Sequence, residues 1–361
     1  MPRFPSALRS RGAVAGALAL LVLVAAGVVL VVLRPWSDDD GTRLEQALAL
    51  APSSTARFSW TDWSAVRHEL GVQLSEGSSA GEINKFLDKG FDADLTSESS
   101  LVNSADVLQR EYGVSPATAD WELLAQGEKG SLLIVGLPSS YDLDALGDRL
   151  DGLGYRHSTG TDGVDAWDGG ASVVSGIGDI SPQLSYIGID AGDHVLVASD
   201  KADYVASWHG SVRGNDLGDG VGQAAATIGD AVSASVYTGD YACGALAMTH
   251  AGDDDRVRAQ DLITQAGEVG PYEGFAIGLL PGGGMRVAMA FDTDAEARTN
   301  ADTRAKLAVG PAPGQGGAFP DRFSVDQVVA DGDVVRMDLD PVQGSYPLSD
   351  LSSGPLLFAT C

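Results

Sequence analysis

The sequence lacks the short motifs that identify a catalytic site. His68-Glu69 begins like the zinc motif HExxH, but Val72 stands where the second histidine belongs. CxxC pairs, Walker loops and Ser-x-x-Lys pairs do not occur. Gly282-Gly283-Gly284 lies between two strand-like runs, which predicts a hairpin turn, because a phosphate loop leads into a helix. We therefore expect that the protein is not an enzyme and that it has no cofactor or metal site.

Cysteine is scarce, with only Cys243 and Cys361 in the whole chain. Two cysteines in a chain of this length do not make a disulfide framework. Outside the cytoplasm they can pair, and the bridge would close a loop of roughly 120 residues, worth up to ~5 kcal/mol in the chain-entropy model. Two free thiols and an intermolecular bridge are the alternatives.

Basic residues are also few: 23 Lys+Arg stand against 50 Asp+Glu. Four of the arginines precede residue 35, where there are no acidic residues, so the rest of the chain carries a net charge of −31. Such a surface repels nucleic acid and anionic headgroups and favours solubility. We expect no nucleic-acid partner; affinity for cations or for a basic partner is the alternative to a generic acidic surface.

One long apolar run is present at residues 13–33, AVAGALALLVLVAAGVVLVVL. Helical geometry makes about 20 apolar residues match the ~30 Å hydrocarbon core, so the run predicts a transmembrane helix. Three arginines precede it and three aspartates follow it, which places residues 1–12 in the cytoplasm and the remainder outside the cell membrane. The alternative is a signal peptide cleaved after Val24-Ala25-Ala26.

The remaining residues predict an α+β fold. A spacer at 34–44 precedes a first extracytoplasmic lobe at 45–210, and a linker rich in Gly and Asp at 211–222 leads to a second lobe at 223–361. The apolar runs are short and linked by hairpin turns, which favours antiparallel sheet. We expect each lobe to be a sheet with helices on one face.

The two lobes resemble each other in sequence, which suggests an internal duplication. FSWTDW (58–63) is similar to SVYTGDY (235–241), and the hairpin at 121–138 to that at 272–291. IGIDAGDHVLVASD (187–200) is similar to VVADGDVVRMDLD (328–340). The shared order indicates a repeated β-α-ββ-α-ββ unit; the alternative is that any α+β chain offers such elements in some order.

Tryptophan supplies the most concentrated binding chemistry. Aromatic side chains at strand ends can line a groove for a sugar or a peptide, so Trp60, Trp63, Trp121 and Trp167 are a candidate binding surface. Packing in the core is the alternative, particularly for Trp60 and Trp63 at a strand–helix junction.

The composition and the stretch APSSTARFSWTDWSAVRHELG (51–71) resemble uncharacterised actinobacterial membrane-anchored cell-envelope proteins. The resemblance implies a location and supplies no catalytic residue. We expect a single-pass membrane protein whose outer part has a binding or structural role with an envelope protein or cell-wall partner. A ligand-binding accessory or sensor domain and a carboxylate-based hydrolase of wall glycans are the alternatives; two facing acids across a cleft would indicate the hydrolase.

Overall fold

The computed structural model of the chain describes residues 41–159, 164–214, 217–218 and 220–361. Thr42–Cys361 forms one compact unit, and the description below is of that unit. The expected cytoplasmic tail and transmembrane helix, and most of the spacer, lie outside the described residues. Within the described ranges, every helix is too short or too polar to cross a membrane.

In the described residues, twelve strands form one sheet, and every neighbouring pair is antiparallel. The strands are β1 (Arg57–Thr61), β2 (Trp121–Gly127), β3 (Gly130–Gly136), β4 (Arg156–Thr159), β5 (Val164–Asp168), β6 (Tyr186–Asp190), β7 (Val195–Ser199), β8 (Ser233–Thr238), β9 (Gly274–Leu279), β10 (Met285–Ala290), β11 (Phe323–Asp331) and β12 (Val334–Pro341). The predicted antiparallel α+β class is confirmed.

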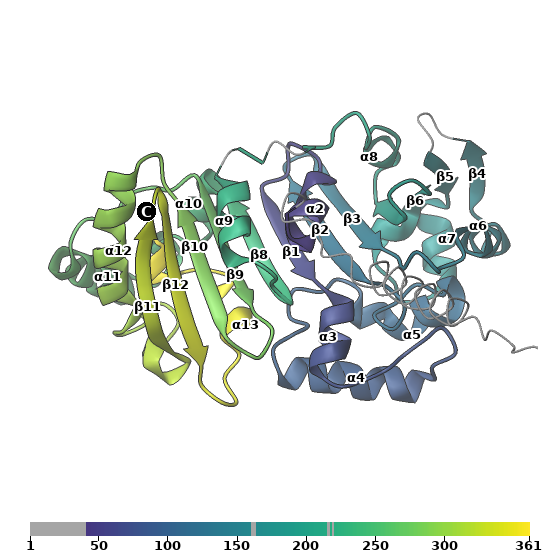
Figure 1. The fold of residues 1–361 in the computed structure, drawn as a ribbon. Coiled ribbons are helices and arrows are strands. Elements are labelled where there is room, and N and C mark those ends of the chain that lie inside the picture. The colour runs from purple at the N-terminus through teal and green to yellow at the C-terminus, as the bar shows by residue number, and fades with distance from the viewer. Residues whose placement is uncertain (1–40, 160–163, 215–216, 219) are drawn as a thin grey trace, which may run out of the picture. The chain divides into compact units, whose positions relative to one another are not determined.

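The sheet has the same strand order on both sides of its centre. Its order is β11-β12-β10-β9-β8-β1-β2-β3-β7-β6-β5-β4, and Figure 1 shows these strands side by side. We call β1–β7 the first half and β8–β12 the second half. Counted outward from the central pair, β1-β2-β3-β7-β6 matches β8-β9-β10-β12-β11.

The expectation of two separate sheets is therefore wrong. Strand β1 pairs with β8 over its whole length, with Ser59 opposite Ser235, and this pairing joins the halves into one sheet. Residues 211–214 of the expected linker also contact the first half, because Val212 bridges to Pro52 and the Arg213 amide donates to the Ala51 carbonyl. Part of that linker begins a helix at Val221.

The helices are α2 (Arg43–Ala49), α3 (Trp63–Glu69), α4 (Ala80–Asp92), α5 (Ala105–Val107), α6 (Leu143–Gly152), α7 (Gly170–Ile177), α8 (Ala202–Ala206), α9 (Val221–Ile228), α10 (Gly239–Ala245), α11 (Asp253–Ala266), α12 (Asp294–Ala308) and α13 (Pro347–Leu351). Several begin where the sequence offers a cap: Asp62, Ser79, Asp142 and Thr293 each accept a hydrogen bond from a first-turn amide.

Helices cover both faces of the sheet, so the expectation of helices on one face is also wrong. Residues of α2, α8 and α9 pack on one face, while residues of α3–α7 and α10–α13 pack on the other. The physical reason lies in the strands, since every residue of β7 and β9 is buried. A strand buried on both faces is a continuous apolar run and needs cover on both sides.

The C-terminal segment is fixed against α10 and α12. Cys243 of α10 and Cys361 form a disulfide, which confirms the predicted bridge. Arg304 of α12 is fully buried and donates to the carbonyl oxygens of Phe358, Thr360 and Gly270 at 2.6, 2.9 and 2.8 Å. The last residues of the chain are thus part of the core.

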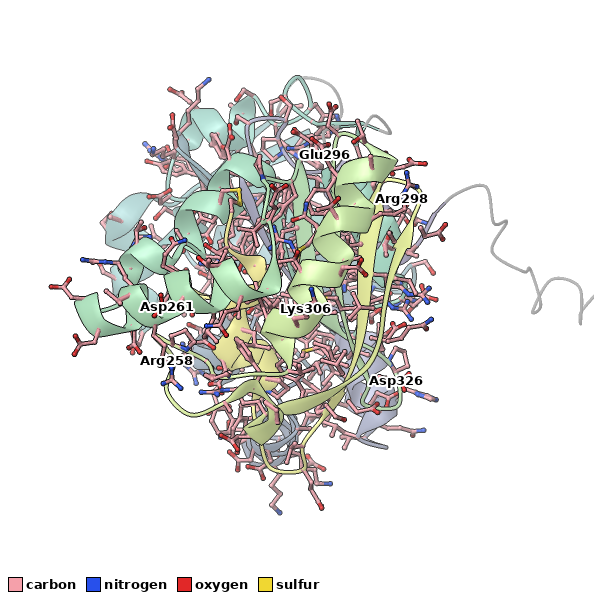
Figure 2. The ribbon with its side chains drawn as sticks, turned by 90° about the vertical axis from the view of Figure 1, so that its left-hand side faces the viewer. Arg258, Asp261, Glu296, Arg298, Lys306 and Asp326 are labelled. Atoms are coloured by element: carbon pink, nitrogen blue, oxygen red, sulfur yellow. A yellow bond between two sulfur atoms is a disulfide. The ribbon has the colours of Figure 1, made fainter. Side chains whose placement is uncertain are left out.

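The outer helices of the second half carry charges of both signs. Figure 2 shows Arg258 and Asp261 on α11, and Glu296, Arg298 and Lys306 on α12. Lys306 joins the two helices, because its Nζ donates to the Ala266 carbonyl at 2.7 Å. The acidic residues in the first turn of each helix interact favourably with the helix dipole.

Candidate functional site

A pocket of about 340 Å³ lies between α3, α6 and the loop at residues 74–76. Its polar lining includes Arg67, Glu76, Tyr141, Asp142 and Arg149. Its apolar lining includes Leu74, Pro138 and Leu146. We call this the α3–α6 pocket. Its volume falls within the range of small-molecule sites, and all of its lining belongs to the first half of the chain.

Arg67 is positioned by the loop that precedes β2. Its Nη1 donates to the carbonyl oxygens of Pro116 and Ala119, both at 2.8 Å, and its Nη2 lies 3.9 Å from an Asp120 carboxylate oxygen. Burial lowers the pKa of Arg67 below its ordinary value, although the group stays charged at neutral pH. A partly desolvated, fixed guanidinium is well suited to hold an anionic group.

Arg149 lies on α6 and forms an ion pair with Glu76. The loop that carries Glu76 is held in place because the Gln109 amide donates to the carbonyl oxygens of Ser75 and Glu76 at 3.3 and 2.6 Å. Asp142 caps α6 by accepting from the Ala145 amide at 3.0 Å. The pocket is therefore lined by two cations and two anions.

Tyr141 gives the pocket an aromatic wall with a hydroxyl group. Burial, and then the nearby Glu76 carboxylate, raise the pKa of Tyr141 to about 12, so the hydroxyl stays protonated. Gly113, at φ +73°, makes this packing feasible. A Cβ there would lie 3.0 Å from the Tyr141 hydroxyl and 3.3 Å from Cζ of Arg149.

A buried carboxylate lies on β2, on the sheet face that α3 covers. Glu122 accepts from the Trp63 indole at 2.8 Å, from the Ser100 amide at 2.6 Å and from the Ser99 hydroxyl at 3.0 Å. Its side chain is fully buried, and burial raises its pKa to about 7. Because all its neighbours in these contacts are donors, Glu122 has a structural role.

Two further buried acids connect the halves. The Ser235 hydroxyl of β8 donates to Glu98 at 2.5 Å. Asp94 accepts from the amides of Leu348 and Ser349 at the start of α13, at 2.6 and 3.2 Å. Burial raises the pKa of Asp94 to about 6. In the described residues, no group of three or more His, Cys, Asp and Glu side chains is placed to hold a metal ion.

The four candidate tryptophans do not form one surface. Trp60 and Trp63 are fully buried in the cores on opposite faces of the sheet. Trp121 packs against Trp60, with ring centroids 5.6 Å apart. Trp167 is 7% exposed, stacks on His157 and donates to Asp151 at 2.9 Å. These side chains serve packing rather than a shared groove.

The α3–α6 pocket cannot be predicted from the sequence. Nothing in the spacing of Arg67 and Arg149 shows that the two helices that carry them meet at one pocket. Glu122 did carry a signal, because it is the one acid within the apolar run WELLA. An acid inside a buried strand needs donors around it.

Comparisons with known proteins add little. No protein-family model matches the chain, and no curated protein matches it. Among solved structures, crystal forms I and III of TP0453 align with TM-scores of 0.37 and 0.36, both at 8% identity. They cover 84% of this chain and 96% and 97% of the TP0453 chains. At these TM-scores, the alignments identify no family for this chain.

Proposed function

We propose that residues 13–33 anchor this protein in the cell membrane by a single pass, with the N-terminus in the cytoplasm. The unit Thr42–Cys361 then lies outside the cytoplasm and has a binding or structural role in the cell envelope, not a catalytic one. The observation that supports this placement best is the Cys243–Cys361 disulfide, because structural disulfides persist in oxidising compartments.

We also propose that the two halves arose by duplication of one β-α-ββ-α-ββ unit. The matching strand order on both sides of the β1–β8 pair supports this proposal. The helices follow the same pattern: α3 follows β1, the first strand of the first half, and α10 follows β8, the first strand of the second half. The agreement extends over five strands of each half.

A ligand-binding role is the second candidate, and the α3–α6 pocket favours it. The pocket combines fixed charges of both signs with an apolar wall, which is the usual composition of a small-molecule site. A structural partner alone would not require such a hollow. A ligand-binding accessory domain would hold its ligand within the first half, not in a cleft between the halves.

Membrane placement can be tested on the full chain. After alkaline carbonate washing, membranes from producing cells should retain the protein, and protease added outside intact spheroplasts should digest the folded unit. Mass spectrometry should find an intact N-terminus. A mature chain that begins after residue 26, or a soluble protein with two titratable thiols, would contradict the proposal.

A further inference from the structure

The α3–α6 pocket carries charges of both signs on a strongly acidic protein. Arg67 and Arg149 supply two positive charges, and Glu76 and Asp142 supply two negative charges. The whole chain has a net charge of −27. A net negative charge repels a simple anion at long range but acts little on a ligand without net charge. The pocket thus favours a ligand that carries both charges itself.

The ion pair at the pocket offers both of the contacts that such a ligand needs. Arg149 and Glu76 have side chains that are 37% and 56% exposed, and an ion pair this open contributes little to stability. A ligand carboxylate can therefore replace Glu76 as the partner of Arg149 at small cost. The guanidinium can bind such a carboxylate through two parallel hydrogen bonds. Glu76 is then left to accept from a ligand ammonium group.

The remaining walls accommodate an apolar body. Leu74, Pro138 and Leu146 line the same pocket together with the Tyr141 ring. A volume of about 340 Å³ leaves room for an aliphatic or aromatic side chain beyond the charged groups. Burial of apolar surface is favourable, so the side chain would add to the affinity.

We infer that the α3–α6 pocket binds a small zwitterion of the amino-acid type, with its carboxylate on Arg149 and Arg67, its ammonium on Glu76, and an apolar side chain against Leu74 and Leu146. This inference rests on the ligand-binding role proposed above and names the class of ligand for that site. It depends on two opposite charges at a fixed separation within one ligand.

Calorimetric titration of the full chain in detergent tests the inference with two zwitterions, L-leucine and L-phenylalanine. L-leucine methyl ester lacks the carboxylate charge, and N-acetyl-L-leucine lacks the ammonium charge. We expect at least one amino acid to bind, and both of the modified leucines to bind at least tenfold more weakly than the better amino acid. Absence of binding by both amino acids at millimolar concentration would overturn the inference, as would equal binding of leucine and both derivatives.

Two variants locate the binding. Arg149→Met should weaken amino-acid binding at least tenfold, while Arg156→Met should leave it unchanged. Arg156 is a matched control, because it also forms an exposed arginine–carboxylate pair, with Asp168 on the neighbouring strand. Circular dichroism and melting temperature report whether each variant folds. Equal loss in two folded variants would overturn the site.

These titrations are independent of the membrane assay. A protein that stays in the membrane but binds neither amino acid leaves the anchor standing and removes the zwitterion site. A protein that binds an amino acid but is found in the soluble fraction leaves the site standing and removes the anchor.

Discussion

Replacement of Glu122 by glutamine should cost the protein less stability at pH 8 than at pH 5. The folded state raises the pKa of Glu122 from 4.5 to about 7 through burial. Below pH 4.5, the folded and unfolded states both hold this proton. As the pH rises from 4.5 to 7, only the unfolded state releases it, so the free energy of unfolding falls.

The expected magnitude follows from the same shift. Each pKa unit corresponds to about 1.4 kcal/mol, so the rise from 4.5 to about 7 corresponds to about 3 kcal/mol. Glutamine is neutral at every pH. Its single oxygen cannot accept from both the Trp63 indole and the Ser100 amide, which reach different carboxylate oxygens, but this loss is the same at every pH. The stability difference between Glu122→Gln and the unchanged protein should therefore shift by about 3 kcal/mol between pH 5 and pH 8, in favour of the variant at pH 8.

Urea unfolding followed by tryptophan fluorescence measures this difference at each pH. All other titrating groups are common to both proteins and largely cancel in the comparison. Glu128→Gln is the matched control, because Glu128 is an exposed residue at the turn between β2 and β3, and its effect should be small at both pH values. A Glu122→Gln difference that does not change with pH would refute the reasoning.

Three further predictions concern stability. Substitution of both Cys243 and Cys361 by serine should lower the free energy of unfolding by up to about 5 kcal/mol, measured by urea unfolding without reductant; an unchanged midpoint would contradict a stabilising bridge. Arg304→Met should cost about 3–5 kcal/mol, because it leaves buried carbonyl groups without donors. The exposed Arg298 of the same helix (Figure 2) is its control, and Arg298→Met should stay within about 0.5 kcal/mol; equal costs would argue against the anchoring role. Gly113→Ala should cost more than Gly71→Ala in thermal unfolding, since both have positive φ but only Gly113 has side chains within 4 Å of the new Cβ.

The hairpins of this fold follow directly from local sequence. PGGG (281–284), which lies between two apolar runs, forms the β9–β10 turn, and GEKG (127–130) forms the β2–β3 turn. The caps Asp62 and Thr293 are also local features, because their side chains act on amides only three residues away. Local signals of this kind need no knowledge of the rest of the chain.

Long-range features cannot be predicted from local sequence in this way. The pairing of β1 with β8 joins residues more than 170 positions apart, and no turn sets its register. The small helix α9 is built from residues such as Ala224 and Ala225, whose weak periodicity gave no sign that it covers the second sheet face. The α3–α6 pocket likewise depends on how three distant segments pack.

The central β1–β8 pair has a consequence for a half taken alone. Cut at this pair, each half would present a full strand with open backbone groups, and such an edge invites pairing with another chain. Antiparallel pairing about a two-fold axis is self-complementary, so two copies of one half have a ready way to cover each other. On the proposed duplication, an ancestral unit with this open edge would pair with its own copy, and fusion of two such units would place that pairing at the centre of one chain.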